Sequence, residues 1–312
     1  MKKLLALIMF AAFLAPQAEA QRYKDARSYY REFYSQSRRI QIKNMRYMEA
    51  VAKGSDERRI KKFREMVVDQ LKDTKKALSR VGPYKEDDIL IREYQGGLDL
   101  YLKAYEELFG NAEELLANRY KSIENLEAYY KLANEAEMMA LDAGYKIEKA
   151  EDYFGKTYQV DLRRDTIMQE RVLKLDEMIV SIREVTLEYF RIDAQLQNLF
   201  ATIDSNKTDN LTEMIGEIRT ATRKARLQLE EVQPLEDYES LLEQALYFCD
   251  EVDGSIDEEL KPMAEVYEFK YKDQDDLADA KDIMLNYKEF LKEMRLEFFA
   301  VREEMILDYL EE

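Results

Sequence analysis

The chain lacks histidine and tryptophan, contains one cysteine, and has few of the residues that interrupt helices. Its 9 Gly and 4 Pro among 312 residues are far fewer than the roughly 12% that these two residues contribute to an average chain. With 46% hydrophobic and 36% charged residues, it fits neither a collagen-like repeat, nor a disulfide framework, nor a disordered segment. These absences favour a globular protein built from helices.

The missing histidine also restricts the chemistry. It removes the commonest metal ligand and the usual general base near neutral pH. Histidine or a cluster of cysteines is needed for several common sites. These are carboxylate-histidine di-iron bundles, Cys/His zinc sites, and Ser-His or Cys-His nucleophile pairs. Neither common Gly-rich phosphate-binding motif occurs. We therefore expect no catalytic residue, no metal, no cofactor and no enzymatic activity. The single Cys249 is expected to be a small buried apolar side chain, and an intermolecular disulfide is the alternative.

Residues 1–20 have the features of a secretory signal peptide. Lys2 and Lys3 precede an apolar stretch at residues 4–14, and Ala18-Glu19-Ala20 fits the small-x-small cleavage rule. The short apolar stretch is typical of bacterial export, so we expect a mature chain from Gln21 in the periplasm, at the cell surface or in the medium. No later uncharged run approaches 18 residues, and no transmembrane anchor is expected.

Apolar residues recur at alternating spacings of three and four residues through the mature chain, which predicts an all-α protein with left-handed, coiled-coil-like helix packing. Ser55 and Asp165 are expected N-caps, and Gly and Pro set other expected helix ends. The expected helices cover about 23–53, 56–81, 87–110, 122–154, 165–204, 210–232, 236–252 and 273–310, with a turn at 205–209.

The expected helix breaks recur at a constant interval. Gly54, Gly82 and Gly110 are 28 residues apart, and Asn206, Pro234 and Pro262 repeat this spacing. The match of breaks and apolar positions predicts a tandem pair of antiparallel four-helix-bundle modules. The expected organisation is a signal peptide at 1–20, a first helical module at 21–155, a linker at 156–164 and a second helical module at 165–312.

The charge is unevenly distributed along the chain. The overall net charge of −17 combines +10 over residues 21–81 with −28 over residues 82–312. Basic residues of the first two expected helices recur at helical spacing, which predicts a docking face for an anionic envelope component or an acidic protein. The alternative is that neighbouring acidic helices neutralise these charges within the module. The residues of the predicted partner-binding face are Lys24, Arg27, Arg31, Tyr34, Arg38, Lys61, Arg64, Lys72 and Lys75.

Two stretches of the chain resemble the sequences of a known group of proteins. Gly82-Pro83-Tyr84-Lys85-Glu86-Asp87-Asp88 is a Pro-containing break followed by acidic residues, and a long acidic helix runs into Tyr153-Phe154-Gly155-Lys156-Thr157-Tyr158. In this layout the chain resembles an uncharacterised family of exported, all-helical bacterial surface proteins and lipoproteins. The resemblance implies the fold and the export. It implies no catalytic residue, and the chain lacks the lipid-acceptor cysteine of the lipoprotein members.

Two functions follow as expectations. The first is a non-enzymatic helical scaffold or binding protein of the bacterial cell envelope, acting through protein–protein or envelope-polyanion contacts. The second is a small-ligand carrier or enzyme with a pocket lined by carboxylates and tyrosines in or between the bundles. The exported location and overall acidity argue against a nucleic acid as the partner.

Overall fold

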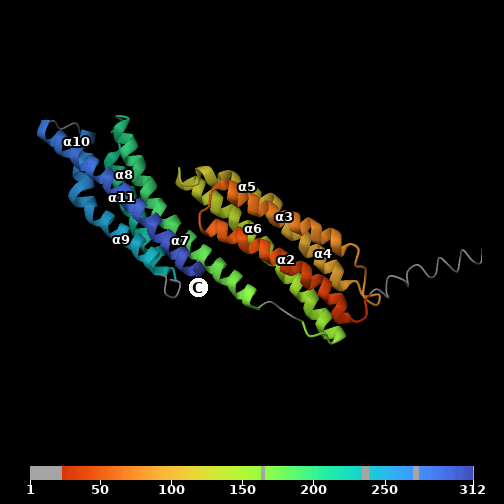
Figure 1. The fold of residues 1–312 in the computed structure, drawn as a ribbon. Helices are drawn as coiled ribbons and strands as arrows, with labels where there is room; N and C mark the ends of the chain where they lie inside the picture. Colours follow the sequence, from red (N-terminus) through yellow and green to blue (C-terminus); the bar gives the residue numbers. More distant parts are fainter. Residues whose placement is uncertain (1–22, 163–165, 234–238, 270–273, 312) are drawn as a thin grey trace, which may run out of the picture. The chain divides into compact units, whose positions relative to one another are not determined.

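The computed structural model describes residues 23–162, 166–233, 239–269 and 274–311, and within these ranges the chain forms helices joined by turns, without a strand (Figure 1). The all-α class predicted from the apolar spacing is therefore confirmed. The predicted signal peptide at 1–20, the expected helix cap Asp165 and the expected break Pro234 lie outside the described residues.

The contacts divide the chain into two compact units. Unit 1 takes the residues up to 116 together with 128–173, and unit 2 takes 117–127 together with 174–312. Most of unit 1 is built from α2 (Ala26–Ala52), α3 (Glu57–Leu78), α4 (Ile89–Leu102), the π-helix η1 (Lys103–Leu108), α5 (Phe109–Leu115), the short 3₁₀ turn η2 (Leu116–Asn118) and α6 (Ile123–Tyr158).

Unit 2 is built largely from α7 (Thr166–Asp204), α8 (Leu211–Glu231), α9 (Ser240–Ser255), the π-helix η3 (Ile256–Leu260), α10 (Lys261–Phe269) and α11 (Gln274–Glu311). Within this unit α8 packs on α9 and α10, and α11 packs on the same two helices.

The division into units differs from the expected linker at 156–164. Residues 117–127, expected in the first module, group with unit 2, and residues 166–173 group with unit 1. The helix expected to end near Gly155 continues to Tyr158, with Gln159 in the left-handed region (φ 54°) as its terminator. Gly155 serves the chain reversal that follows, because a Cβ there would lie 3.0 Å from Cγ of Leu162. Its lack of a side chain therefore lets the chain fold back over the helix end.

Two of the expected breaks end helices by the same geometry. Gly54 (φ 60°) follows α2, and Asn206 (φ 56°) follows α7. In both, the next amide bonds a carbonyl five residues back: Ser55 donates to Ala50 and Lys207 to Thr202. This Schellman arrangement needs a residue that tolerates positive φ, which explains Gly and Asn at these positions. The next helix, α3, is capped by the Asp56 side chain rather than by the expected Ser55.

The expected breaks at Gly110 and Pro262 are wrong, because helices run through both residues. Gly110 lies in α5 directly after η1, and Pro262 lies in α10 directly after η3. A π segment shifts the hydrogen-bond register by one residue, and a proline is tolerated in the first turn after such a shift. π-Helices make up well under 1% of residues in soluble proteins. Their occurrence before both members of one matched pair therefore supports the internal repeat.

The core of unit 1 combines large rings with small residues. Tyr29 and Phe33 of α2 are fully buried, and their ring centroids lie 5.5 Å from Phe154 and 5.1 Å from Tyr94, respectively. The face of α6 toward the core is rich in alanine, with one every seven residues at positions 136, 143 and 150, all buried. The small alanine side chains of α6 leave room for the aromatic rings of the other helices, so that the core is filled without clashes.

Candidate functional site

Four basic side chains on one side of α2 form what we call the α2 basic face. Lys24, just before the helix, and Arg27, Arg31 and Arg38 are all exposed, and the spacing of the three arginines places them within a narrow arc of the helix surface. Arg27 and Arg31 form no ion pair within the described part of the chain. On the opposite side of the helix Tyr29 and Phe33 fill the core, which fixes the basic face outward.

Tyr34, predicted as part of the same face, is half-buried and packs against the hydrophobic core of unit 1. It therefore contributes at most its edge to the surface beside Arg31 and Arg38.

The predicted residues of α3 are mostly engaged within unit 1. Lys72 pairs with Glu106 at 2.8 Å, and Lys75 pairs with Asp99. These partners come from η1 and α4, so this half of the expected face is balanced by acidic neighbours, as in the alternative considered from the sequence. Lys61 is exposed.

Arg64 is the most enclosed of the predicted site residues. Its Nε lies 2.9 Å from a carboxylate oxygen of Glu113, and both side chains are about nine-tenths buried. Arg64 also donates to the backbone carbonyl of Tyr105. Burial raises the pKa of Glu113, and the adjacent Arg64 opposes that rise. Arg64 thus ties α3 to η1 and α5, which makes it a structural residue of the unit.

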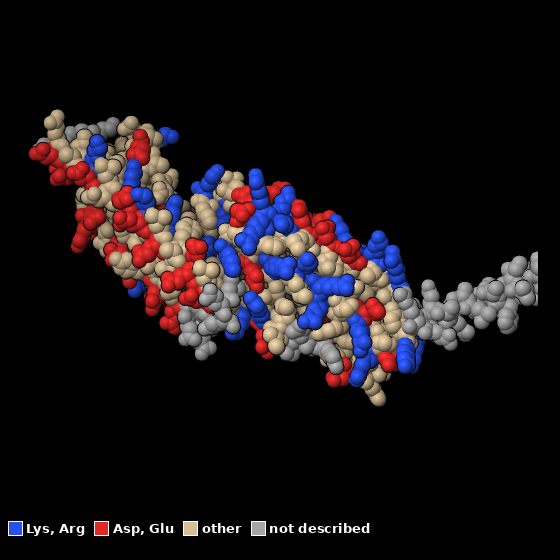
Figure 2. Space-filling view, in the orientation of Figure 1, with Lys and Arg blue, Asp and Glu red and all other residues tan. Residues whose placement is uncertain are grey.

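The two units differ in net charge. Outside residues 1–20, unit 1 has 28 Lys and Arg against 26 Asp and Glu, whereas unit 2 has 18 against 38. On the faces drawn in Figure 2, Lys and Arg gather over α2 and α3, and Asp and Glu predominate among the charged residues of unit 2. The sequence showed the contrast between residues 21–81 and the rest, but not that the whole excess of acidic residues belongs to unit 2.

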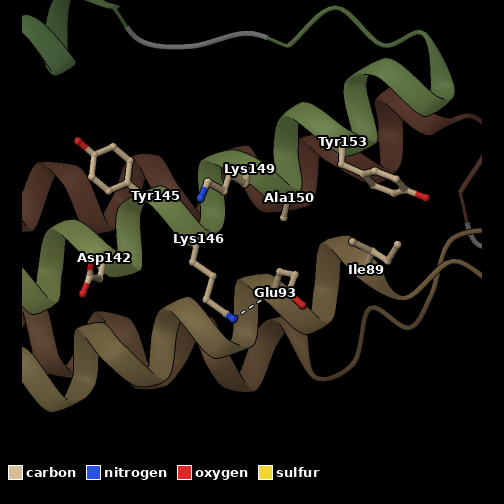
Figure 3. A pocket seen from close by; sticks show the side chains of 8 residues that line it. All are labelled: Ile89, Glu93, Asp142, Tyr145, Lys146, Lys149, Ala150 and Tyr153. Atoms are coloured by element: carbon tan, nitrogen blue, oxygen red, sulfur yellow. Dashed lines mark ion pairs between the residues drawn. The ribbon is translucent and has the colours of Figure 1, made fainter.

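One open groove lies on unit 1 between α4 and α6, with a volume of about 810 Å³ (Figure 3). Its lining residues are Ile89, Glu93, Asp142, Tyr145, Lys146, Lys149, Ala150 and Tyr153.

Glu93 occupies the centre of this groove and is already paired. Lys146 Nζ lies 2.8 Å from one oxygen of its carboxylate, and Arg92 Nε lies 3.2 Å from the other oxygen. Both cations lower the pKa of Glu93. Figure 3 shows the side chains of Glu93 and Lys146 pointing toward one another, while Tyr145 points away from them. The groove therefore does not bring two carboxylates together, which a general acid–base pair would require.

The described residues contain no group of three or more His, Cys, Asp or Glu placed to hold a metal ion. Cys249 is buried in α9, as predicted, and burial raises the pKa of its thiol to about 12. Among all the described residues, no helix is long and apolar enough to cross a membrane.

Comparisons of the chain with protein-family models, with curated proteins and with solved structures give no match. The family resemblance drawn from the Gly82–Asp88 stretch stays a prediction.

Proposed function

We propose that this chain is an exported, non-enzymatic binding protein that recognises an anionic partner through the α2 basic face. The observation that supports this most directly is the difference between the two basic helices. Basic residues of α3 are paired within unit 1, whereas Arg27 and Arg31 of α2 stand exposed without an ion pair in the described residues. Clustered basic charge of this kind attracts anions and raises the rate of encounter with them.

The non-enzymatic part of the proposal rests on chemistry. The chain has no histidine, its one thiol is buried, and Glu93 in the groove of unit 1 is paired with Lys146. A helical unit with a charged face is suited to binding, because the core beneath holds the backbone of the face, so that only its side chains are ordered when a partner binds.

Binding is tested with a labelled poly-L-glutamate probe by fluorescence anisotropy. The triple variant Arg27→Glu, Arg31→Glu, Arg38→Glu should weaken binding at least about tenfold. A matched control reverses three exposed lysines of unit 1 that belong to other helices, Lys103→Glu in η1 and Lys131→Glu and Lys156→Glu in α6. Both variants change the net charge equally. If the control weakens binding as much as the α2 variant, or if the wild-type chain does not bind the probe, the proposal is wrong.

Export is tested separately, because the signal peptide lies outside the described residues. Expression of the full chain in a bacterium should yield a protein that begins at Gln21, as read by mass spectrometry. Ala18→Arg and Ala20→Arg should block that cleavage, because small residues are needed at the cleavage site. An unprocessed wild-type chain retained in the cytoplasm would contradict the export.

A further inference from the structure

A second charged face lies on α11. Seven exposed carboxylates follow one side of this helix at steps of three, four or seven residues, and we call them the α11 acidic face. They are Asp279, Asp282, Glu289, Glu293, Glu297, Glu304 and Asp308.

No Lys or Arg of α11 falls on the acidic face. At about 100° per residue, its seven carboxylates occupy an arc of roughly 100°, and the basic residues of α11 lie on the other side of the helix. One of the seven, Glu289, pairs with Lys292 at 2.7 Å across the edge of the arc. Buried residues such as Leu291 and Phe298 hold the remaining side of the helix against unit 2. The acidic face is therefore fixed outward, as the α2 basic face is.

The two faces match in spacing as well as in sign. Arg27, Arg31 and Arg38 are separated by four and seven residues, and so are the three carboxylates of Glu293, Glu297 and Glu304. At a rise of about 1.5 Å per residue, the arginines of the basic face, from Arg27 to Arg38, extend over roughly 16 Å, within the roughly 44 Å of the acidic face. Two helices laid side by side can thus bring several opposite charges together.

We propose that the α2 basic face of one copy of this chain binds the α11 acidic face of a second copy. This inference rests on the proposed function and names its anionic partner. Because the two surfaces are different, each pair of copies keeps one free face of each kind after the first contact. Such a heterologous contact repeats, and it produces rings when the rotation closes and open chains when it does not.

The dependence of self-association on salt concentration distinguishes this contact from general electrostatic repulsion between copies. The full sequence carries −17 and the mature chain from residue 21 carries −18, so two chains repel one another at low ionic strength. At about 0.1 M salt the Debye length is about 10 Å, which screens distant charges more than charges in contact, and at about 1 M it is about 3 Å. Self-association should therefore be strongest near the first concentration and fall at least about tenfold by the second.

Sedimentation velocity of the mature chain over a concentration series tests the proposal. Two variants are used: Arg27→Glu, Arg31→Glu, Arg38→Glu on α2, and Glu293→Lys, Glu297→Lys, Glu304→Lys on α11. Each variant alone should sediment as a monomer, because the three reversed positions of one face then meet charges of the same sign on the other face. An equimolar mixture should associate again, because the three reversed positions of each variant meet opposite charges at the reversed positions of the other. Circular dichroism checks that both variants remain helical.

The outcomes separate this inference from the proposed function. Association of the wild-type chain, loss in each variant and recovery in the mixture support the second copy as partner. A wild-type chain that stays monomeric at both salt concentrations overturns the inference, and so does a mixture that fails to recover. If the monomeric chain still binds poly-L-glutamate through α2, the proposed function stands and the partner is another acidic molecule. Poly-L-glutamate binding that the α2 variant and the lysine control weaken equally overturns the proposed function instead.

Discussion

Asp193 on α7 accepts a hydrogen bond from Arg295 on α11, and only the arginine of this pair reaches solvent. The Asp193 side chain is 1% exposed and that of Arg295 is 37% exposed. Burial raises the pKa of Asp193 above its ordinary value, and Arg295 opposes that rise. The pair therefore joins two long helices of unit 2. Loss of Arg295 leaves a buried carboxylate unpaired, whereas loss of Asp193 leaves an arginine that still reaches solvent.

Replacement of Arg295 by Met should lower the free energy of unfolding by about 3–5 kcal/mol near pH 8, because it leaves a buried carboxylate without a countercharge. A raised carboxyl pKa in the folded state means that this cost is fully present above the folded pKa. It decreases as pH falls toward the unfolded value of about 3.9, because the folded chain then takes up the proton. Urea unfolding of variant and wild type near pH 8 and near pH 5.5 measures the change.

Two further variants are controls for this pair. Arg226→Met removes the partner of Asp250 at a half-exposed site, and it should cost less than about 1 kcal/mol. The double variant Asp193→Leu, Arg295→Met should recover most of the lost stability, because no unpaired charge is left in the core. A cost for Arg295→Met as small as that of the exposed control would show that Asp193 is solvated.

The turn after α3 contains a strained backbone that one substitution should relax. Lys85 and Glu86 both have positive φ, 49° and 72°, between Tyr84 and Asp87, whose backbone groups bond one another. This two-residue turn favours Gly at its second position. Glu86→Gly should raise the free energy of unfolding by about 1 kcal/mol, since a non-Gly residue in this region costs roughly 1–2 kcal/mol. Glu86→Ala keeps the strain and should give no gain. Thermal unfolding compares the two variants, and equal melting temperatures would contradict the prediction.

How far the sequence predicted this fold depends on which interactions set each feature. The apolar spacing predicted most helices of both units to within a few residues at most ends, because a helix end depends on its own caps and glycines, but α10 was not among the expected helices. Gly110 and Pro262 were misread, because a π segment depends on backbone register and leaves no pattern in the apolar spacing. The π segments could be recognised only once the hydrogen bonds were seen.

The candidate site was predicted less completely than the fold. The basic spacing on α2 identified an exposed face, but the pairing of Lys72 with Glu106 and of Arg64 with Glu113 depends on how separate helices align, which a single sequence does not specify. The α11 acidic face was missed although a signal existed. Its carboxylates recur at the same three- and four-residue steps as the apolar seam that includes Met284 and Leu291, and they occupy another side of the helix.

The close approach of α4 and α6 depends on a glycine. A Cβ at Gly97 would lie 2.6 Å from Cγ1 of Ile147 and 3.1 Å from the carbonyl oxygen of Ala143. Gly97→Ala should therefore lower the free energy of unfolding by about 1–3 kcal/mol, because the backbone oxygen cannot move aside as a side chain can. Urea unfolding measures the loss. The matched control is Gly216→Ala in α8, where nothing lies within 4 Å of the added carbon. That change should stabilise by up to about 1 kcal/mol, and a loss there would contradict the steric account.

The thiol of Cys249 should be unreactive in the folded chain. Its side chain is 1% exposed in α9, and burial raises the pKa of the thiol to about 12. The thiolate is the reactive form, so the native chain near pH 8 should react with Ellman's reagent at least about a hundredfold more slowly than the chain unfolded in urea. The same burial argues against the intermolecular disulfide considered from the sequence, and the native protein should run as a monomer on a non-reducing denaturing gel. A labelling rate in the native state equal to that in urea would show that α9 opens readily, and a disulfide-linked dimer would show that the thiol reaches the surface.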